Sequence, residues 1–171
     1  LMRVLMDDYN YEWDDAWRIV TGTVAYTNHT VMAEALEKWP QDTVRSLLPR
    51  INMIIEEINP HFQFEVDHKG LLHIWNNVAI IKEGQVHMAH LAIVGSHSVN
   101  GVAKLHSQIL VDDVMKEFAV LYPERFNNKT NGITHRRWLL YSNPQLTSLL
   151  EDTIGDSFKT NPEDLEKLMD Y

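Results

Sequence analysis

Residues 88–110 read Met-Ala-His-Leu-Ala-Ile-Val-Gly-Ser-His-Ser-Val-Asn-Gly-Val-Ala-Lys-Leu-His-Ser-Gln-Ile-Leu and are the least surface-like stretch of the chain. The segment Met88–Val94 is apolar except for one histidine, which favours a buried helix, and Gly95 stands where a left-handed helix cap would lie. From Val102 apolar residues recur at steps of three and four, which predicts a second helix. Residues 95–101 therefore connect two packed segments. Their glycines are six positions apart and no Gly-Lys-Ser/Thr follows, so a nucleotide-binding loop is not indicated.

Short β-rich segments on both sides of this stretch predict a parallel sheet. One strand is expected at Val24–Thr27, a second at residues 97–99 and a third at residues 126–129. A helix between the second and third strands would complete a right-handed crossover. Ligands gather beyond the carboxyl ends of parallel strands. The polar triplet Asn28-His29-Thr30 follows the first strand and Asn131 follows the third, so both are candidate binding positions at one sheet edge.

The remaining segments predict a helix-rich α/β protein. Asn10 is expected to cap a helix in which Trp13, Trp17 and Val20 form one buried stripe. Trp39 is also expected in the core, at the end of its helix. Further helices are expected at residues 31–39, 42–58 and 113–121 and through most of 136–171.

Breaks in the helical pattern predict the connections. Pro49 is expected to kink the helix of residues 42–58 or to open a new segment, and Asn59-Pro60 to end it. Apolar residues then alternate with polar ones over 62–66 and again at 72–74, which predicts a small hairpin. Asn131-Gly132 is expected to turn the chain.

Composition restricts the function. The 171 residues are 44% hydrophobic and 23% charged, as in an ordinary globular protein with one core. The net charge of −9 argues against nucleic-acid binding, which requires a basic face. No stretch approaches the roughly 18 apolar residues of a membrane helix, and no membrane partner is expected. The absence of cysteine fits a reducing compartment.

The sequence disfavours three further chemistries: a zinc site, a serine hydrolase and a glycoside hydrolase. A zinc cluster is conceivable, but no carboxylate stands at ligand spacing and no His-Glu-x-x-His occurs, so no metal is assigned to His87, His90, His97 and His106. The run Gly95-Ser96-His97 lacks the Gly-x-Ser-x-Gly elbow of a serine hydrolase. The carboxylate pairs Asp14-Asp15 and Asp112-Asp113 occupy exposed helix positions, where solvated charges are a better account than glycoside hydrolysis.

Five blocks of the sequence together resemble one family, the α-glucan phosphorylases that act on glycogen and maltodextrin. The blocks are Ala25-Tyr-Thr-Asn-His-Thr30, Ala35-Leu-Glu-Lys-Trp-Pro40, Met88-Ala-His-Leu-Ala-Ile-Val-Gly-Ser-His97, Val99-Asn-Gly-Val-Ala103 and Lys129-Thr-Asn-Gly-Ile-Thr134, the last followed by Arg136-Arg-Trp138. The resemblance covers the whole chain and implies part of a Rossmann-like domain of the B-type glycosyltransferase fold. Because family members are several times longer, the chain is expected to be an internal fragment. Residues 1–131 would be the C-terminal portion of the N-terminal domain, and residues 132–171 a linker and the helical start of the C-terminal domain.

The resemblance implies a glycosyltransferase that cleaves α-1,4-glucans with orthophosphate and releases glucose 1-phosphate. It also implies pyridoxal phosphate as cofactor, a homodimer and a cytoplasmic location. No lysine of this chain stands in a Gly-Asn-Met-Lys setting, so the cofactor's attachment residue is expected outside it. The fragment alone is therefore expected to be inactive.

Two sugar-contacting residues carry over from the resemblance. His29 is the implied catalytic residue, whose main-chain carbonyl and ring hold the glucosyl unit in the transition state. Asn131 is implied to bind the 6-hydroxyl group of the same sugar. Ser96, His97 and Asn100 are expected to brace the sheet and its loop, without a chemical role.

A second function remains open at this point: a non-catalytic carbohydrate-binding or structural module derived from a phosphorylase. Exposed aromatic platforms would favour the module, whereas tryptophans placed in the core favour a truncated enzyme.

Overall fold

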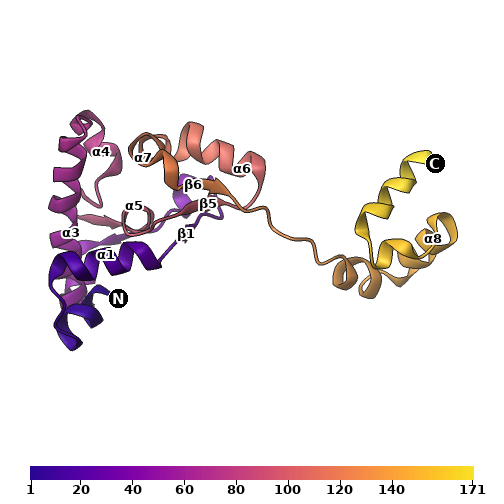
Figure 1. Ribbon diagram of the computed structural model, residues 1–171, viewed down its shortest axis with the longest axis horizontal. Helices are drawn as coiled ribbons and strands as arrows, with labels where there is room; N and C mark the ends of the chain where they lie inside the picture. The colour runs from indigo at the N-terminus through magenta and orange to yellow at the C-terminus, as the bar shows by residue number, and fades with distance from the viewer. The chain divides into compact units, whose positions relative to one another are not determined.

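The computed structural model describes residues 1–171, which form two compact units, Leu1–Thr130 and Asn131–Tyr171 (Figure 1). In the first unit, short strands alternate with helices, as expected for a helix-rich α/β protein. The strands are β1 Tyr26–Thr27, β2 Lys38–Pro40, β3 Ile81–Lys82, β4 Gln85–His87, β5 Val99–Gly101 and β6 Phe126–Asn128. The α-helices are α1 Trp13–Thr23, α2 Gln41–Leu47, α3 Pro49–His68, α4 Trp75–Val78, α5 Met88–Val94, α6 Lys104–Ile109 and α7 Lys116–Leu121. Turns of 3-10 helix occur at η2 Ala33–Ala35, η3 Leu72–Ile74 and η5 Pro123–Arg125, and turns of π-helix at η1 Val4–Asp8 and η4 Leu110–Val114.

Strands β1, β5 and β6 form the predicted parallel sheet, in that order. The register pairs Tyr26 with Val99, and Val99 with Phe126. Helices α6 and α7 connect β5 to β6, and Figure 1 draws them on the other side of the strands from α1. All three predicted strands are therefore present, although β1 begins two residues later than expected and β5 is centred on Asn100.

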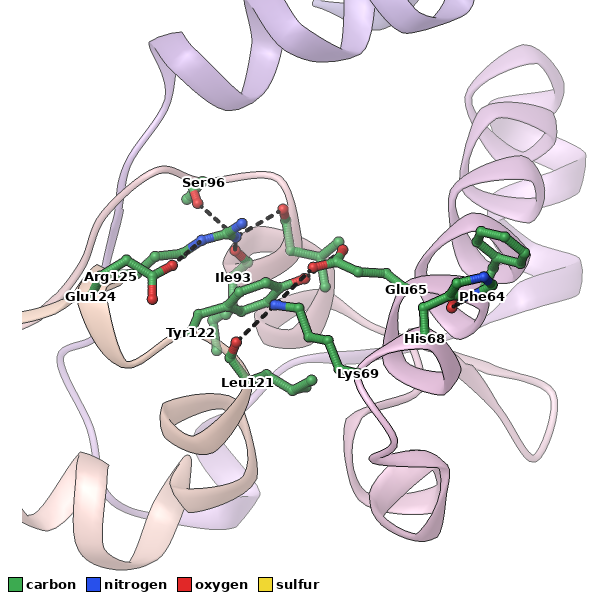
Figure 2. Close-up of polar contacts among 11 residues, drawn as sticks. Phe64, Glu65, His68, Lys69, Ile93, Ser96, Leu121, Tyr122, Glu124 and Arg125 are labelled. Atoms are coloured by element: carbon green, nitrogen blue, oxygen red, sulfur yellow. Dashed lines mark hydrogen bonds and ion pairs between the residues drawn. The ribbon is translucent and has the colours of Figure 1, made fainter.

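Helix α5 forms as predicted, but Gly95 does not cap it in the left-handed conformation. Gly95 has φ −80°, an ordinary helical value. The terminal carbonyl groups are satisfied instead by a distant side chain, because Arg125 Nη1 donates to the carbonyls of Ile93 at 3.2 Å and Ser96 at 3.0 Å (Figure 2). A cation at the C-terminal end of a helix also complements its dipole. Arg125 therefore satisfies the carbonyl groups at the end of α5, the role that the sequence analysis expected of Gly95.

Arg125 belongs to a polar cluster around the buried ring of Tyr122 that joins α3, α5 and the segment after α7 (Figure 2). Its guanidinium carbon lies 3.5 Å from the ring centroid of Tyr122, whose hydroxyl donates to Glu65 at 2.9 Å. Lys69 Nζ lies 4.5 Å from the same ring and donates to the carbonyl of Leu121. Burial raises the pKa of Tyr122, so the phenol stays protonated and remains a donor. The cluster fixes the segments that lead into β5 and β6.

The predicted hairpin at 62–66 and 72–74 is wrong, because α3 continues through Pro60 to His68. Residues four apart, Ile58, Phe62 and Val66, are all buried and extend the apolar stripe of the helix. Phe64, which produced the apparent alternation, faces solvent. The interpretation of Pro49 is confirmed, since it occupies the first turn of α3, where a missing N–H costs nothing.

A second, antiparallel sheet of order β2-β4-β3 was not predicted. Glu83 and Gly84 form its tight turn with φ of 52° and 71°. The expected helix at 31–39 is wrong, because only Ala33–Ala35 is helical and Lys38–Pro40 pairs with β4. Trp39 is accordingly 47% exposed and lies outside the core.

The predicted N-cap of α1 is also wrong. Asn10 has φ 56° and lies before the start of α1, whose N-cap position is taken by Glu12. The stripe is nevertheless present, since Val20 is buried and Trp13 and Trp17 pack against the core.

The second unit is helical, as predicted. It contains the π-helical η6 Arg136–Tyr141, α8 Pro144–Ile154 and the 3-10 helices η7 Ser157–Lys159 and η8 Pro162–Asp170. Asn143 caps α8, its Oδ1 accepting from the Leu146 N–H at 3.1 Å. The expected turn at Asn131-Gly132 is wrong, because residues 131–134 have no turn and Gly132 does not adopt positive φ. No helix of the chain is long and apolar enough to cross a membrane.

Candidate functional site

The carboxyl ends of β1, β5 and β6 lie side by side and are rich in asparagine. β1 runs into Asn28, β5 contains Asn100, and β6 contains Asn127 and Asn128. The register aligns Asn100 with Asn127 across neighbouring strands. The amides of these asparagines bond to neighbouring protein groups, so they brace the loops that follow the strands.

Asn28 is 1% exposed and is held from three directions. Its Oδ1 accepts from the Thr30 N–H at 2.9 Å and lies 3.0 Å from His106 Nε2. Its Nδ2 donates to the hydroxyl of Tyr26 at 3.2 Å. Because both lone pairs of Oδ1 are taken, Asn28 shapes the loop and has little capacity left for a ligand.

The geometry fixes the tautomer of His106. The Val102 N–H donates to His106 Nδ1 at 3.1 Å, so Nδ1 carries no hydrogen in the neutral ring. The hydrogen therefore resides on Nε2, which donates to Asn28 Oδ1. This imidazole joins the start of α6 to the loop after β1.

Asn100 braces the same edge, as predicted. It is 5% exposed, and its Oδ1 accepts from Thr27 Oγ1 at 2.9 Å. Its main-chain carbonyl accepts from the Asn28 N–H at 2.9 Å, which extends the ladder one residue beyond β1. The position of the next residue, His29, is thus set by the contacts of Asn100 with Thr27 and Asn28.

Gly101 permits the close approach of α6 to the end of β5. A Cβ placed on Gly101 would lie 2.6 Å from Ser107 Oγ and 2.9 Å from the Ser107 main chain. Ser107 Oγ in turn donates to Asn128 Oδ1 at 2.8 Å. Only glycine leaves room for this link between β5, α6 and β6.

His29 directly follows Asn28, and its side chain is exposed. The hydrogen bonds that shape its loop come from its neighbours Asn28 and Thr30, whose hydroxyl accepts from the Met32 N–H at 3.0 Å. An exposed ring and carbonyl on a braced loop can meet a ligand without large rearrangement.

Asn131 is exposed and begins the second unit, two residues beyond the Lys129 N–H that donates to the Gly101 carbonyl. His29 and Asn131 therefore belong to different units.

Two of the four histidines considered for zinc, His90 and His106, make other hydrogen bonds. His90 Nδ1 donates to the Ala79 carbonyl at 2.9 Å and His106 is bonded to Asn28. No group of three or more histidine, aspartate or glutamate side chains that could hold a metal ion is present.

Sequence reasoning found the strand ends but missed Asn28 and His106 as a pair. They are 78 positions apart, so no local pattern links them. The sequence signal that could have indicated this role is the position of His106, four residues after Val102, where the connection to the second predicted helix ends.

Comparison with known proteins assigns the family. The family model "Carbohydrate phosphorylase" matches residues 1–171. Glycogen phosphorylase of Bacillus subtilis (strain 168) is 54% identical over 177 aligned residues, covering 100% of this chain and 22% of the relative. The muscle form from Bos taurus is 45% identical, covering 100% of this chain and 21% of the relative. The brain form from Homo sapiens is 47% identical, covering 99% and 21%. The chain spans about a fifth of the length of these relatives. With its whole length matched, the chain belongs to the carbohydrate phosphorylase family.

Proposed function

We propose that this chain is part of an α-glucan phosphorylase, a glycosyltransferase that cleaves α-1,4-glucans with orthophosphate and releases glucose 1-phosphate. The observation that carries the proposal is the 54% identity to a glycogen phosphorylase over the full length of the chain.

The proposal extends to the fold and its division. The sheet β1-β5-β6 with its helices is consistent with part of a Rossmann-like domain of the B-type glycosyltransferase fold. We assign residues 1–131 to the end of the N-terminal domain, and residues 132–171 to a linker and the start of the C-terminal domain. The unit boundary between Thr130 and Asn131 supports a division close to this point.

His29 and Asn131 are the proposed sugar-binding residues. The carbonyl and ring of His29 would stabilise positive charge that develops on the glucosyl unit in the transition state. The bracing of its loop by Asn28 and Asn100 supports this role, because a preorganised dipole does not need to reorient during the reaction. Asn131 would orient the same sugar through its 6-hydroxyl group.

The proposed cofactor, pyridoxal phosphate, would supply its phosphate group as proton donor and acceptor. The residues of this chain do not fit its attachment site, because none of the eight lysines is buried. Homodimerisation and a cytoplasmic location are further parts of the proposal and rest on the family.

The test is a phosphorolysis assay on the complete protein. With maltoheptaose and phosphate, glucose 1-phosphate should accumulate in proportion to enzyme, and it should be absent when phosphate is omitted. Release of free glucose or maltose instead would indicate hydrolysis, and no product would refute the enzyme assignment. The 171-residue chain by itself should be inactive.

The second candidate, a non-catalytic carbohydrate-binding module, is favoured by one observation. Trp39 is 47% exposed and Trp138 is 64% exposed, and exposed aromatic rings can stack on a ligand. The prediction that Trp39 is a core residue was wrong, so this alternative retains support. The phosphorolysis assay separates the two candidates, since a module would bind glucan without releasing glucose 1-phosphate.

A further inference from the structure

A polar pocket of about 240 Å³ lies beside the antiparallel sheet and shares no lining residue with the His29 loop. Its lining includes two lysines, two histidines and two asparagines: Lys38, Lys82, His87, His90, Asn76 and Asn77. Two lysines thus face one acid, Glu37, in a chain whose net charge is −9. The proposed phosphorylase activity does not use it.

Strand register explains why these side chains meet. Lys38 of β2 pairs directly with His87 of β4, and Lys82 of β3 pairs with Gln85. Since Gln85 and His87 are two apart on one strand, all four side chains share one face of the sheet. The opposite face carries the buried Val86 and packs into the core.

Helices α5 and α4 complete the pocket. His90 lies on the first turn of α5, with its ring centroid 4.9 Å from that of His87. Because His90 Nδ1 donates to the Ala79 carbonyl, its Nε2 carries only a lone pair in the neutral ring and gives no hydrogen to an anion. Asn77 of α4 donates one amide hydrogen to Glu117 of α7 at 3.0 Å, which leaves its second amide hydrogen for another acceptor.

The charges that face the pocket are incompletely balanced. Lys38 takes part in none of the ion pairs of the chain. Lys82 has one exposed partner, Glu83, at 3.8 Å. The one acid of the lining is Glu37, whose carboxylate accepts from Trp39 Nε1. Burial, the neighbouring ring of His90 and both lysines lower the pKa of His87 to about 4, so this ring is neutral and the two lysines carry the positive charge of the pocket.

We propose that this pocket is an anion site that binds a phosphate group between Lys38 and Lys82. Two ammonium groups supply the charge, and the free amide hydrogen of Asn77 supplies a directional donor. The pocket is smaller than the roughly 300–1,000 Å³ typical of drug-sized ligands, which favours inorganic phosphate or a small phosphate monoester.

Site-resolved lysine acetylation tests this on the complete protein. Modification rates of Lys38 and Lys82 are measured by peptide mass spectrometry in phosphate and in sodium chloride of equal ionic strength. At ten times the dissociation constant, occupancy should slow both rates about tenfold by mass action. Exposed Lys116 on α7, outside the pocket, should keep its rate. Phosphate bound at a catalytic site would not protect these two lysines.

Variants then test whether the two lysines hold one anion. Lys38→Gln should abolish the phosphate protection of Lys82, and Lys82→Gln should abolish that of Lys38. Lys116→Gln is the matched control and should leave both unchanged. Glycerol 3-phosphate in place of phosphate identifies the source, because protection by it shows that a monoester fits. Equal slowing of all three lysines, no slowing, or protection of Lys82 that survives Lys38→Gln would each overturn the proposal.

Discussion

Replacing His106 with alanine should displace the loop that carries His29. The imidazole accepts from the Val102 N–H at 3.1 Å and donates to Asn28 at 3.0 Å, and no other side chain bridges these two segments. With alanine, Asn28 Oδ1 loses one of its two donors inside the core, since Asn28 is 1% exposed. Movement of the loop toward solvent would then let water replace the lost donor to Asn28 Oδ1.

The magnitude follows from the two lost hydrogen bonds. Each is worth about 0.5–1.5 kcal/mol, so His106→Ala should cost about 1–3 kcal/mol of loop stability. If about 1.4 kcal/mol of this appears as misplacement of His29 in the transition state, turnover falls about tenfold. His106→Gln can still donate through its amide to Asn28, so it should recover about half of the loss.

Steady-state phosphorolysis by the complete protein measures this effect. His106→Ala should lower kcat more than it raises KM for glucan, and His73→Ala, an exposed histidine on η3, should leave both unchanged. The double variant with Asn28→Ala should lose less than the sum of the single losses, with a coupling of about 0.5–3 kcal/mol. Unchanged kcat in His106→Ala, or strictly additive losses, would refute the reasoning.

Three further predictions concern other residues. Asn131→Ala and a 6-deoxyglucose substrate should be non-additive by about 1–3 kcal/mol if the amide binds the 6-hydroxyl group, and additive kinetics would remove that assignment. Gly101→Ala should lower the urea-unfolding free energy by about 1–3 kcal/mol, because its Cβ would lie 2.6 Å from Ser107 Oγ, and Ser107→Gly in the same background should recover part of the loss. In the folded protein the pKa of His87 is about 4, whereas in the unfolded chain the ring protonates below about pH 6.5. Its contribution to stability is therefore present above pH 6.5 and is lost as the pH falls toward 4. His87→Gln should flatten the decline of the unfolding midpoint across that interval in chloride buffer, and an unchanged slope would contradict the burial of this ring.

The parallel sheet could be predicted because its strands carry local signals. β1 is the second half of a β-rich tetrad and is followed by a polar triplet, and β6 lies between Pro123 and Asn131-Gly132. The strands of the antiparallel sheet carry no such local signal in the sequence. Lys38 and His87 pair across almost fifty residues, and the sequence around Lys38 has an apolar spacing that also suits a helix. Phe64 led to the opposite error, a strand predicted where the chain is helical, because this exposed aromatic residue produced the alternating pattern of a strand.

The candidate site likewise contains one residue that the local sequence indicates and others whose role depends on contacts between distant segments. His29 was found because its position after β1 is a property of the local sequence. The side chains that hold its loop were not, because the bond between His106 and Asn28 exists only after α6 packs over the sheet. The Arg125 contacts with the end of α5 are equally non-local, and a glycine at the expected cap position concealed the need for them.

The most direct measurement of the central claim is the kinetics of His29→Ala in the complete protein. The claim is that this sheet edge holds the glucosyl unit in the transition state, so kcat should fall by more than KM for glucan rises. Some activity should survive, because the main-chain carbonyl of residue 29 remains. A rise in KM with unchanged kcat, or no change in either, would contradict the account.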